Sequence, residues 1–398
     1  MNIARAEEYG FAPDRLALIR PSLQKYIDDG KIAGILSMVA RRGKVVHFER
    51  MGWMDLASQK PIDFDTIFRI YSMSKPITSA AAMMLFEENR FHLNDPVSKY
   101  IPAFKNMKVI AHQEGDEVEL VDAKREITIC DLFTHSSGMS YGFDEKDYLD
   151  GLYRKNVWEM REKNPDATLE DLVNAVAQLP LRFHPGSAFH YSFSIDVLGY
   201  LVEVLSGMPF DRFLQERIFA PLGMLDTSFW VGPEKAQRLA SMYGPDEKET
   251  GKLKDIDPNP ESEYTRPVKF FSGGGGLVST ASDYLRFCQM LLNKGELDGV
   301  HLLGRKTVEF MFQNHLPAGV YLDQDPAKGF GLGGAVILDQ VKTQMLGSNG
   351  LWWWGGAAST LFWIDPQEEL IGLMMLQFMP GLYPLEMDFH NLVYQALI

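Results

Sequence analysis

The sequence has few residues that could crosslink the chain or hold a metal. Its 398 residues include two cysteines, Cys130 and Cys288, and each lies inside an apolar pattern. A disulfide framework or a thiolate metal site needs more cysteines at closer spacing, so we expect two separate buried thiols. The nine histidines show no H-E-x-x-H spacing, which argues against a zinc enzyme. We therefore expect no metal site.

Positive charge and long apolar runs are also scarce. The net charge is −14, and no run of Lys and Arg offers the basic surface that nucleic-acid phosphates require. No stretch of about 18 apolar residues is uninterrupted, so we expect no membrane span. The N-terminal residues 1–21 contain early acidic residues and no apolar core of a signal peptide. These absences predict a cytoplasmic protein that binds neither nucleic acid nor a membrane.

Residues 138–142 match the letters of G-x-S-x-G, the nucleophile turn of α/β-hydrolases. Another common functional motif is missing. The glycine run at 273–276 lacks the Lys-Ser/Thr of a phosphate-binding loop, so we do not expect phosphate there. The chain is otherwise ordinary, with 46% hydrophobic and 23% charged residues, which is typical of a globular protein with a sizeable core.

Hydrophobic periodicity places strands at both ends of the chain and helices between them. A helix is expected over 12–29, and two strands joined at Gly43 follow it. Further helices are expected at 168–178, 194–206, 280–294 and 386–397. Strand-like runs of the C-terminal third lie at 330–338, 341–347, 357–364 and 369–377, with a turn at Asp365-Pro366.

This order of elements predicts an α/β (α+β) fold with one sheet assembled from both ends of the chain. We expect residues 1–75 and 280–398 to form an antiparallel sheet flanked by helices. Residues 76–279 are expected to form an inserted all-helical domain, with the functional site between the two parts.

Residues 72–75 read S-M-S-K, an S-x-x-K motif whose chemistry depends on helical geometry. Residues three apart share one face of a helix, so the Lys75 amine can reach the Ser72 hydroxyl and activate it as a nucleophile. Free N–H groups in the first turn of such a helix favour an oxyanion. The same pattern at 22–25 falls inside a helix rather than at a strand-to-helix junction, so we interpret Ser22 as an exposed helix residue.

A tyrosine and a pair of glycines lie further along the chain. Tyr191 stands at the edge of a loop before an apolar helix, and beside a lysine ammonium a tyrosine loses its proton more easily. The alternative is a core or surface aromatic, since the chain has 15 tyrosines. Residues 352–357 read W-W-W-G-G-A, and adjacent glycines permit close approach of a ligand or another backbone. The alternative here is a buried aromatic cluster with a glycine bulge.

Five stretches in order carry a family resemblance: IYSMSKPITSAA, LFTHSSGM, HPGSAFHYSFSIDVLGYLVE, GGGGLVSTASDYLRF and WGG, spread over residues 70 to 357. With these stretches the chain resembles the serine β-lactamase/penicillin-binding-protein superfamily. Within it, the chain is similar to the β-lactamase-like carboxylesterases (family VIII), which are related to class C β-lactamases. The resemblance covers nearly the whole chain and implies a β-lactamase-like fold.

The resemblance implies roles for the residues singled out above. Ser72 would be the acylated nucleophile and Lys75 its partner in activation. Tyr191 takes the place of the tyrosine in the family's Tyr-x-Asn motif and would pass a proton to the leaving group. The backbone N–H groups of Ser72 and Ala357 would form the oxyanion hole. His135 is expected to orient a loop rather than to act as a base.

The resemblance also implies five substrate-binding residues, two of which depart from the β-lactamase pattern. The five are Trp354, Gly355, Gly356, Tyr141 and Phe193. Trp354 stands where true β-lactamases carry the lysine of Lys-Thr-Gly, and Phe193 stands where class C enzymes carry an asparagine. Each lost polar contact weakens β-lactam binding by about 1–3 kcal/mol. An aromatic replacement suits an uncharged ester.

These features predict a serine carboxylesterase that cleaves short-chain esters by two-step acyl transfer, with weak β-lactamase activity as a side reaction. The reaction needs no cofactor, and the expected partner is a small-molecule ester bound by a monomer or homo-oligomer. Other enzymes of the same chemistry are alternatives: a β-lactamase, a D-amino-acid peptidase or an acyltransferase. A different class remains open too, a penicillin-binding protein that is acylated without turnover.

Overall fold

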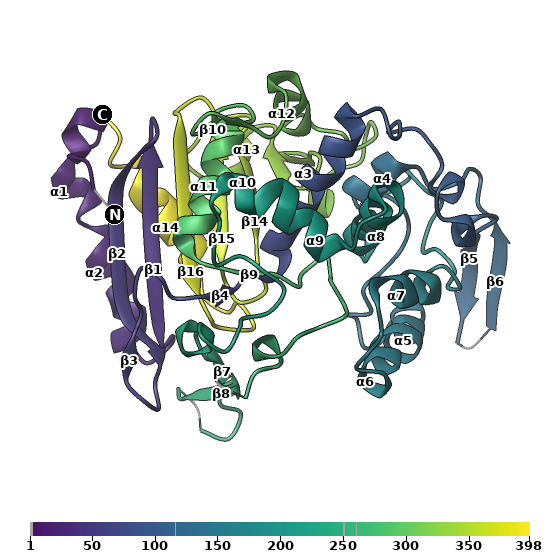
Figure 1. Ribbon diagram of the computed structural model, residues 1–398, viewed down its shortest axis with the longest axis horizontal. Helices are drawn as coiled ribbons and strands as arrows, with labels where there is room; N and C mark the ends of the chain where they lie inside the picture. The colour runs from purple at the N-terminus through teal and green to yellow at the C-terminus, as the bar shows by residue number, and fades with distance from the viewer. Residues whose placement is uncertain (1–2, 116, 250, 260) are drawn as a thin grey trace.

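One antiparallel sheet forms the centre of the protein. The computed structural model describes residues 3–398 except 116, 250 and 260 (Figure 1). The eight strands follow the spatial order β12 (Lys328–Phe330), β13 (Ala335–Ile337), β14 (Trp352–Gly355), β15 (Leu361–Asp365), β16 (Leu370–Leu376), β1 (Gly34–Arg41), β2 (Lys44–Asp55) and β3 (Lys60–Pro61). The pairing of β1 with β16 joins the two ends of the chain. The expectation of one sheet built from both ends is confirmed.

The central strands are apolar on both faces because both faces are covered. In β1, Leu36 and Met38 pack into one hydrophobic core, whereas Ile35 and Val39 pack into another. Successive side chains of a strand point to opposite faces, so a strand between two cores becomes a nearly continuous apolar run. The sequence of β16, L-I-G-L-M-M-L, follows the same rule.

Helices from the two chain ends cover one face of the sheet. They are α1 (Pro13–Leu16), α2 (Ile19–Asp28) and α14 (Leu385–Tyr394), which stand together at the left of Figure 1. On the other face, α11 (Ala281–Leu292) packs against β15 and β16. None of the helices in the described part of the chain combines the length and apolar character that a membrane span requires.

The segment between the sheet-forming parts is mainly helical. Its α-helices are α3 (Ser74–Glu87), α4 (Ile129–Phe133), α5 (Tyr148–Tyr153), α6 (Glu159–Lys163), α7 (Leu169–Val176), α8 (Ser194–Ser206), α9 (Phe210–Leu214) and α10 (Ala220–Leu222). It also carries two hairpins, β5 (Lys108–Glu114) with β6 (Glu117–Asp122), and β7 (Met242–Pro245) with β8 (Leu253–Asp257). The expectation of an all-helical insertion is therefore wrong.

The sequence pattern concealed the β5–β6 hairpin for a physical reason. The hairpin projects from the body at the right of Figure 1, and most of its side chains are exposed. A strand without a buried face has no need for alternating apolar residues. The strand expected at 341–347 is also wrong, because α13 (Gln340–Thr343) lies there. The Asp339 carboxylate accepts from the Lys342 N–H and caps this short helix.

Buried neutral histidines make the fold sensitive to acid. Burial lowers the pKa of His47 and of His390 to about 4, below the ordinary value of 6.5. The unfolded chain therefore binds more protons than the folded one between these values, so stability is complete above pH 6.5 and falls as the pH drops towards 4. We expect each histidine to cost up to about 3 kcal/mol at pH 4, measured as a falling Tm.

A matched pair of variants tests this pH dependence. His47→Gln should flatten the dependence of Tm on pH between 7 and 4.5. His301→Gln should leave it unchanged, because the His301 side chain is 74% exposed. Equal slopes in the two variants would contradict the role of the buried ring.

Candidate active site

Ser72 lies in a short turn that connects the sheet side of the protein to α3. Strand β4 (Phe68–Arg69) pairs with β9 (Val278–Ser279), and the 3₁₀ turn Tyr71–Met73 runs straight into α3. The Tyr284 hydroxyl donates to the Met73 carbonyl at 2.9 Å, which fixes this turn from the side of α11. Tyr71 has a φ of 41°, in the left-handed region that non-glycine residues rarely adopt. Strain of this kind, next to a candidate nucleophile, is typical of functional sites.

The structure brings together the three residues singled out for catalysis. The Tyr191 hydroxyl donates to Ser72 Oγ at 2.7 Å, and Lys75 Nζ donates to the same oxygen at 3.2 Å. The Lys75 ammonium also lies 4.5 Å from the centroid of the Tyr191 ring. The Ser72 hydroxyl thus has hydrogen bonds to one amine and one phenol, and a proton could pass between Ser72 and either of them.

Lys75 is held in place by its surroundings. Its side chain is buried, with 1% exposed, and Nζ donates to the Gly274 carbonyl at 2.6 Å. The ring of Tyr141 lies on its other side, with its centroid 5.2 Å from Nζ. A lysine side chain has many rotamers, and these contacts select the one that points at Ser72.

Asp196, which the sequence did not single out, binds the segment that contacts Lys75. Its buried carboxylate accepts from Ser272 Oγ at 2.5 Å and from the Gly274 N–H at 3.1 Å. Burial raises the pKa of Asp196, while Ser272 and the Lys75 charge act in the opposite direction. The available signal was a lone aspartate inside the apolar stretch of α8, where an unpaired carboxylate would be costly.

His135, which was expected to orient a loop, contacts the loop that carries Tyr191. Its Nδ1 accepts from the Ser192 N–H at 3.2 Å, and its ring lies 4.7 Å from the Tyr191 ring between centroids. Burial lowers the pKa of His135 well below its usual range. The ring is therefore neutral at pH 7, with its proton on Nε2, which is buried and lacks a partner among the described residues.

The glycine pair after β14 allows that strand to approach the Ser72 turn. A Cβ on Gly356 would collide with the Ile70 carbonyl and with Thr360 Oγ1, so only glycine fits between them. The next residue, Ala357, is exposed. Within the described chain, neither the Ala357 N–H nor the Ser72 N–H donates to a backbone acceptor outside the helices and strands. An oxyanion hole requires two amides of this kind next to the nucleophile.

The predicted substrate-binding residues fall into two groups. Trp354 is half-buried, and its ring centroid lies 5.5 Å from that of Tyr191 and 5.1 Å from that of Phe330. Gly355 follows it at the end of β14. Phe193 is buried in an aromatic cluster, 4.5 Å from Tyr141 and 5.3 Å from Trp158 between centroids. Phe193 therefore acts from behind Tyr141 rather than as a polar contact.

Tyr141 separates two hollows. One has a volume of about 880 Å³ and lies towards residues 187–191 and 319–324, and the other has about 510 Å³ and lies towards α6 and residues 263–276. Both are lined by Tyr141 and by Phe143, which stacks on it and is 68% exposed. Burial, followed by Asp196, raises the pKa of Tyr141 well above its ordinary value, so it stays protonated.

The candidate site is built from a hydroxyl, an amine and a phenol. Among the residues the structure describes, no group of three or more His, Cys, Asp or Glu side chains could hold a metal ion. Cys130 and Cys288 are free thiols, half-buried and buried respectively. What the arrangement can do is activate one hydroxyl, stabilise negative charge beside it and exchange a proton with a leaving group.

Comparisons with known proteins cover most of the chain. A family model described as Beta-lactamase matches residues 19–395. Protein Rv1367c of Mycobacterium tuberculosis is 35% identical over 375 residues, which cover 91% of this chain and 90% of that protein. Lovastatin esterase of Penicillium rubens is 30% identical over 379 residues, covering 89% of this chain and 91% of the esterase. The solved structure of EstCE1, a hydrolase with promiscuous acyltransferase activity, superposes with a TM-score of 0.81 at 27% identity and covers 96% of this chain and 99% of its own.

Proposed function

The chain belongs to the beta-lactamase family of serine hydrolases, and we propose that it is a carboxylesterase that cleaves short-chain esters through an acyl-enzyme on Ser72. The observation that carries this proposal is the triangle of hydrogen bonds and charge formed by Ser72, Lys75 and Tyr191. A serine hydroxyl is a weak nucleophile unless a neighbouring group takes its proton, and here two candidates touch it.

The geometry supports the following sequence of steps. With Tyr191 as phenolate, stabilised by the ammonium of Lys75, Ser72 donates its proton to the phenolate and attacks the ester carbonyl. The negative charge on the carbonyl oxygen is accepted by the N–H groups of Ser72 and Ala357. The carbon–oxygen bond to the alcohol then breaks, and Tyr191 returns its proton to the departing oxygen. Water, activated by the same phenolate, hydrolyses the acyl-enzyme and restores Ser72.

The surroundings of Ser72 favour uncharged esters over β-lactams. The position that resembles the carboxylate-holding lysine is Trp354, and its indole packs on Tyr191. The position that resembles the amide-holding asparagine is Phe193, and its side chain is buried behind Tyr141. A β-lactam would lose both polar contacts, whereas a short ester has no group that needs them.

We expect kcat/KM for p-nitrophenyl butyrate to exceed that for ampicillin by at least about 10²-fold, since each lost polar contact is worth about 1–3 kcal/mol. Nitrocefin, with its reactive ring, should fall between the two. The measurement is kcat/KM for the three compounds on one preparation. If the value for ampicillin equals or exceeds the value for the ester, the protein is a β-lactamase and the proposal is wrong.

Acyl transfer to an alcohol is a second candidate, favoured by the likeness to EstCE1, whose transferase activity is named beside its hydrolysis. Both reactions share the acyl-enzyme and differ in whether water or an alcohol attacks it. Product analysis with p-nitrophenyl butyrate and added alcohol separates them, because a transferase accumulates the new ester. A stoichiometric burst without further turnover would instead identify a protein that traps its ligand.

A further inference from the structure

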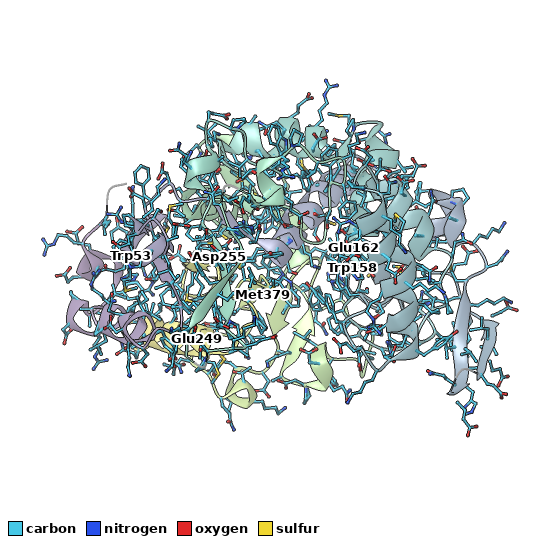
Figure 2. All side chains as sticks on the ribbon, turned by 90° about the horizontal axis from the view of Figure 1, so that it is seen from below. Trp53, Trp158, Glu162, Glu249, Asp255 and Met379 are labelled. Carbon is cyan, nitrogen blue, oxygen red and sulfur yellow. The ribbon has the colours of Figure 1, made fainter. Side chains whose placement is uncertain are left out.

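The 510 Å³ hollow lies next to the candidate catalytic residues, although none of Ser72, Lys75 and Tyr191 lines it. Tyr71, Gly274 and Tyr141 line it near Ser72 and Lys75, and α6 lines it further out. Trp158 and Glu162, which also line it, mark its position in Figure 2, where the molecule is seen from below. Its walls are largely aromatic, formed by Trp158, Phe193, Phe229, Tyr264 and Phe270.

One cation in this hollow has no hydrogen-bond or ion-pair partner among the described residues. Arg161, in α6, is half-buried, and its guanidinium lies 4.0 Å from the centroid of Phe270 and 5.7 Å from that of Trp158. No hydrogen bond or ion pair joins this guanidinium to any residue in the described part of the chain. Arg154 offers a contrast seven residues earlier, since its guanidinium donates to three backbone carbonyls. Arg161 is held by stacking, and its five N–H donors remain available.

The other charged groups around the hollow do not satisfy Arg161. Lys269 is paired with Asp166 at 3.0 Å, and Asp196 is occupied by Ser272 and Gly274. Glu162 and Glu263 are exposed, and neither lies within ion-pair distance of Arg161. Burial lowers the pKa of Arg161, and the nearby carboxylate of Glu263 acts in the opposite direction. A guanidinium remains charged at neutral pH in either case.

We propose that this hollow binds the carboxylate at the far end of an ester substrate, and that Arg161 pairs with it. This inference rests on the proposed esterase function and adds a substrate class, the esters that carry a free carboxylate. A planar guanidinium matches a carboxylate with two parallel hydrogen bonds, and the aromatic walls suit the hydrocarbon between the two ends. Arg161 does not replace the lysine absent at Trp354, because no residue of β14 lines this hollow.

Matched pairs of substrates test the proposal and locate the charge. For a carboxylate on the acyl side, mono-4-nitrophenyl adipate is compared with 4-nitrophenyl 6-oxoheptanoate, in which a methyl ketone replaces the carboxylate. For a carboxylate on the alcohol side, 4-acetoxybenzoate is compared with 4-acetylphenyl acetate. For each pair, kcat/KM of the charged ester is divided by kcat/KM of the neutral one. In Arg161→Met this ratio should be about 10- to 100-fold lower than in the wild type for one pair, the range expected for a charge-assisted hydrogen bond.

Two further variants serve as controls for the effect of Arg161→Met. Arg161→Lys keeps the charge but loses the two-pronged geometry, so its ratio should lie between those of the wild type and Arg161→Met. Lys269→Met removes a cation that already has a partner, and it should keep the ratio within about 2-fold of the wild type. A ratio that is unchanged in Arg161→Met for both pairs overturns the proposal.

A binding measurement separates failure of this inference from failure of the esterase proposal. Monomethyl adipate is titrated calorimetrically into the Ser72→Ala protein, with and without Arg161→Met. We expect Kd to rise at least about 10-fold when Arg161 is removed. If no ester is hydrolysed, the esterase proposal fails and this titration still decides the role of Arg161. If neutral esters are hydrolysed but Kd does not change, or monomethyl adipate does not bind, the inference alone fails.

Discussion

Replacing Ser72 by alanine should abolish hydrolysis of p-nitrophenyl butyrate, with kcat lowered by at least about 10⁴-fold, while the protein stays folded. The loss is large because Ser72 Oγ is the atom on which both Lys75 Nζ and the Tyr191 hydroxyl converge. The side chain is small, so alanine leaves the packing of the turn nearly unchanged. Activity is measured by release of nitrophenolate, and folding is measured by Tm.

The chain contains its own control for this experiment. Ser22-Leu23-Gln24-Lys25 has the same motif but lies within α2, and Lys25 Nζ pairs with Asp29 at 2.9 Å instead of pointing at the serine. Ser22→Ala should therefore retain full activity. Phenylmethylsulfonyl fluoride should label Ser72, as located by mass spectrometry. Retained activity in Ser72→Ala, with the label on another residue, would refute the assignment of the nucleophile.

Removing either proton partner should lower kcat/KM by at least about 10²-fold, in line with general-base contributions of about 10²–10⁴. Tyr191→Phe is the cleaner change, because the ring contacts with His135 and Trp354 are kept and only the hydroxyl is lost. Lys75→Ala removes the ammonium that lies 4.5 Å from the Tyr191 ring and leaves the Gly274 carbonyl without its donor. Stopped-flow measurement of the burst gives the acylation rate separately.

The two variants also show which group accepts the proton of Ser72. If acylation is slow in both, the lysine and the tyrosine work as one unit. Near-normal kcat/KM in Tyr191→Phe would instead mean that Lys75 or water accepts the proton of Ser72. A fall in Tm of several degrees in Lys75→Ala alone would indicate that its loss also disturbs the buried contact with Gly274.

The sequence predicted those parts of the protein where burial and periodicity agree. The helix expected at 194–206 is α8 with the same bounds, and the turn expected at Asp365-Pro366 separates β15 from β16. Helix α8 and the two strands are largely buried, so their apolar spacing is imposed by the core. The exposed β5–β6 hairpin and the capped turn of α13 have no such constraint, and local hydrogen bonds decided their form.

The residues of the candidate site also differ in whether the sequence could predict them. Ser72 and Lys75 could be identified because their spacing on one helix is a local property. Tyr191 needed the family resemblance, because 119 residues separate it from Ser72. Asp196 stood out only as a lone aspartate in the apolar stretch of α8, and Arg161 did not stand out, since the sequence of a helix does not reveal which partner a charged residue has. Only the arrangement in space shows that Asp196 accepts from Ser272 and that Arg161 has no hydrogen-bond partner in the described part of the chain.

The pairing of β1 with β16 has a consequence for the order of events during synthesis. Val39 pairs with Gly372, so the middle of the sheet cannot close until nearly the whole chain has been made. Contacts so distant in sequence form late, because the entropy cost of closing a long loop comes before the free energy that the contacts supply. Ala357, whose amide is proposed to complete the oxyanion hole, follows β14 and waits for the same docking step. A growing chain on the ribosome should therefore carry Ser72 for most of its synthesis without hydrolytic competence, which arrives only when the last strands dock.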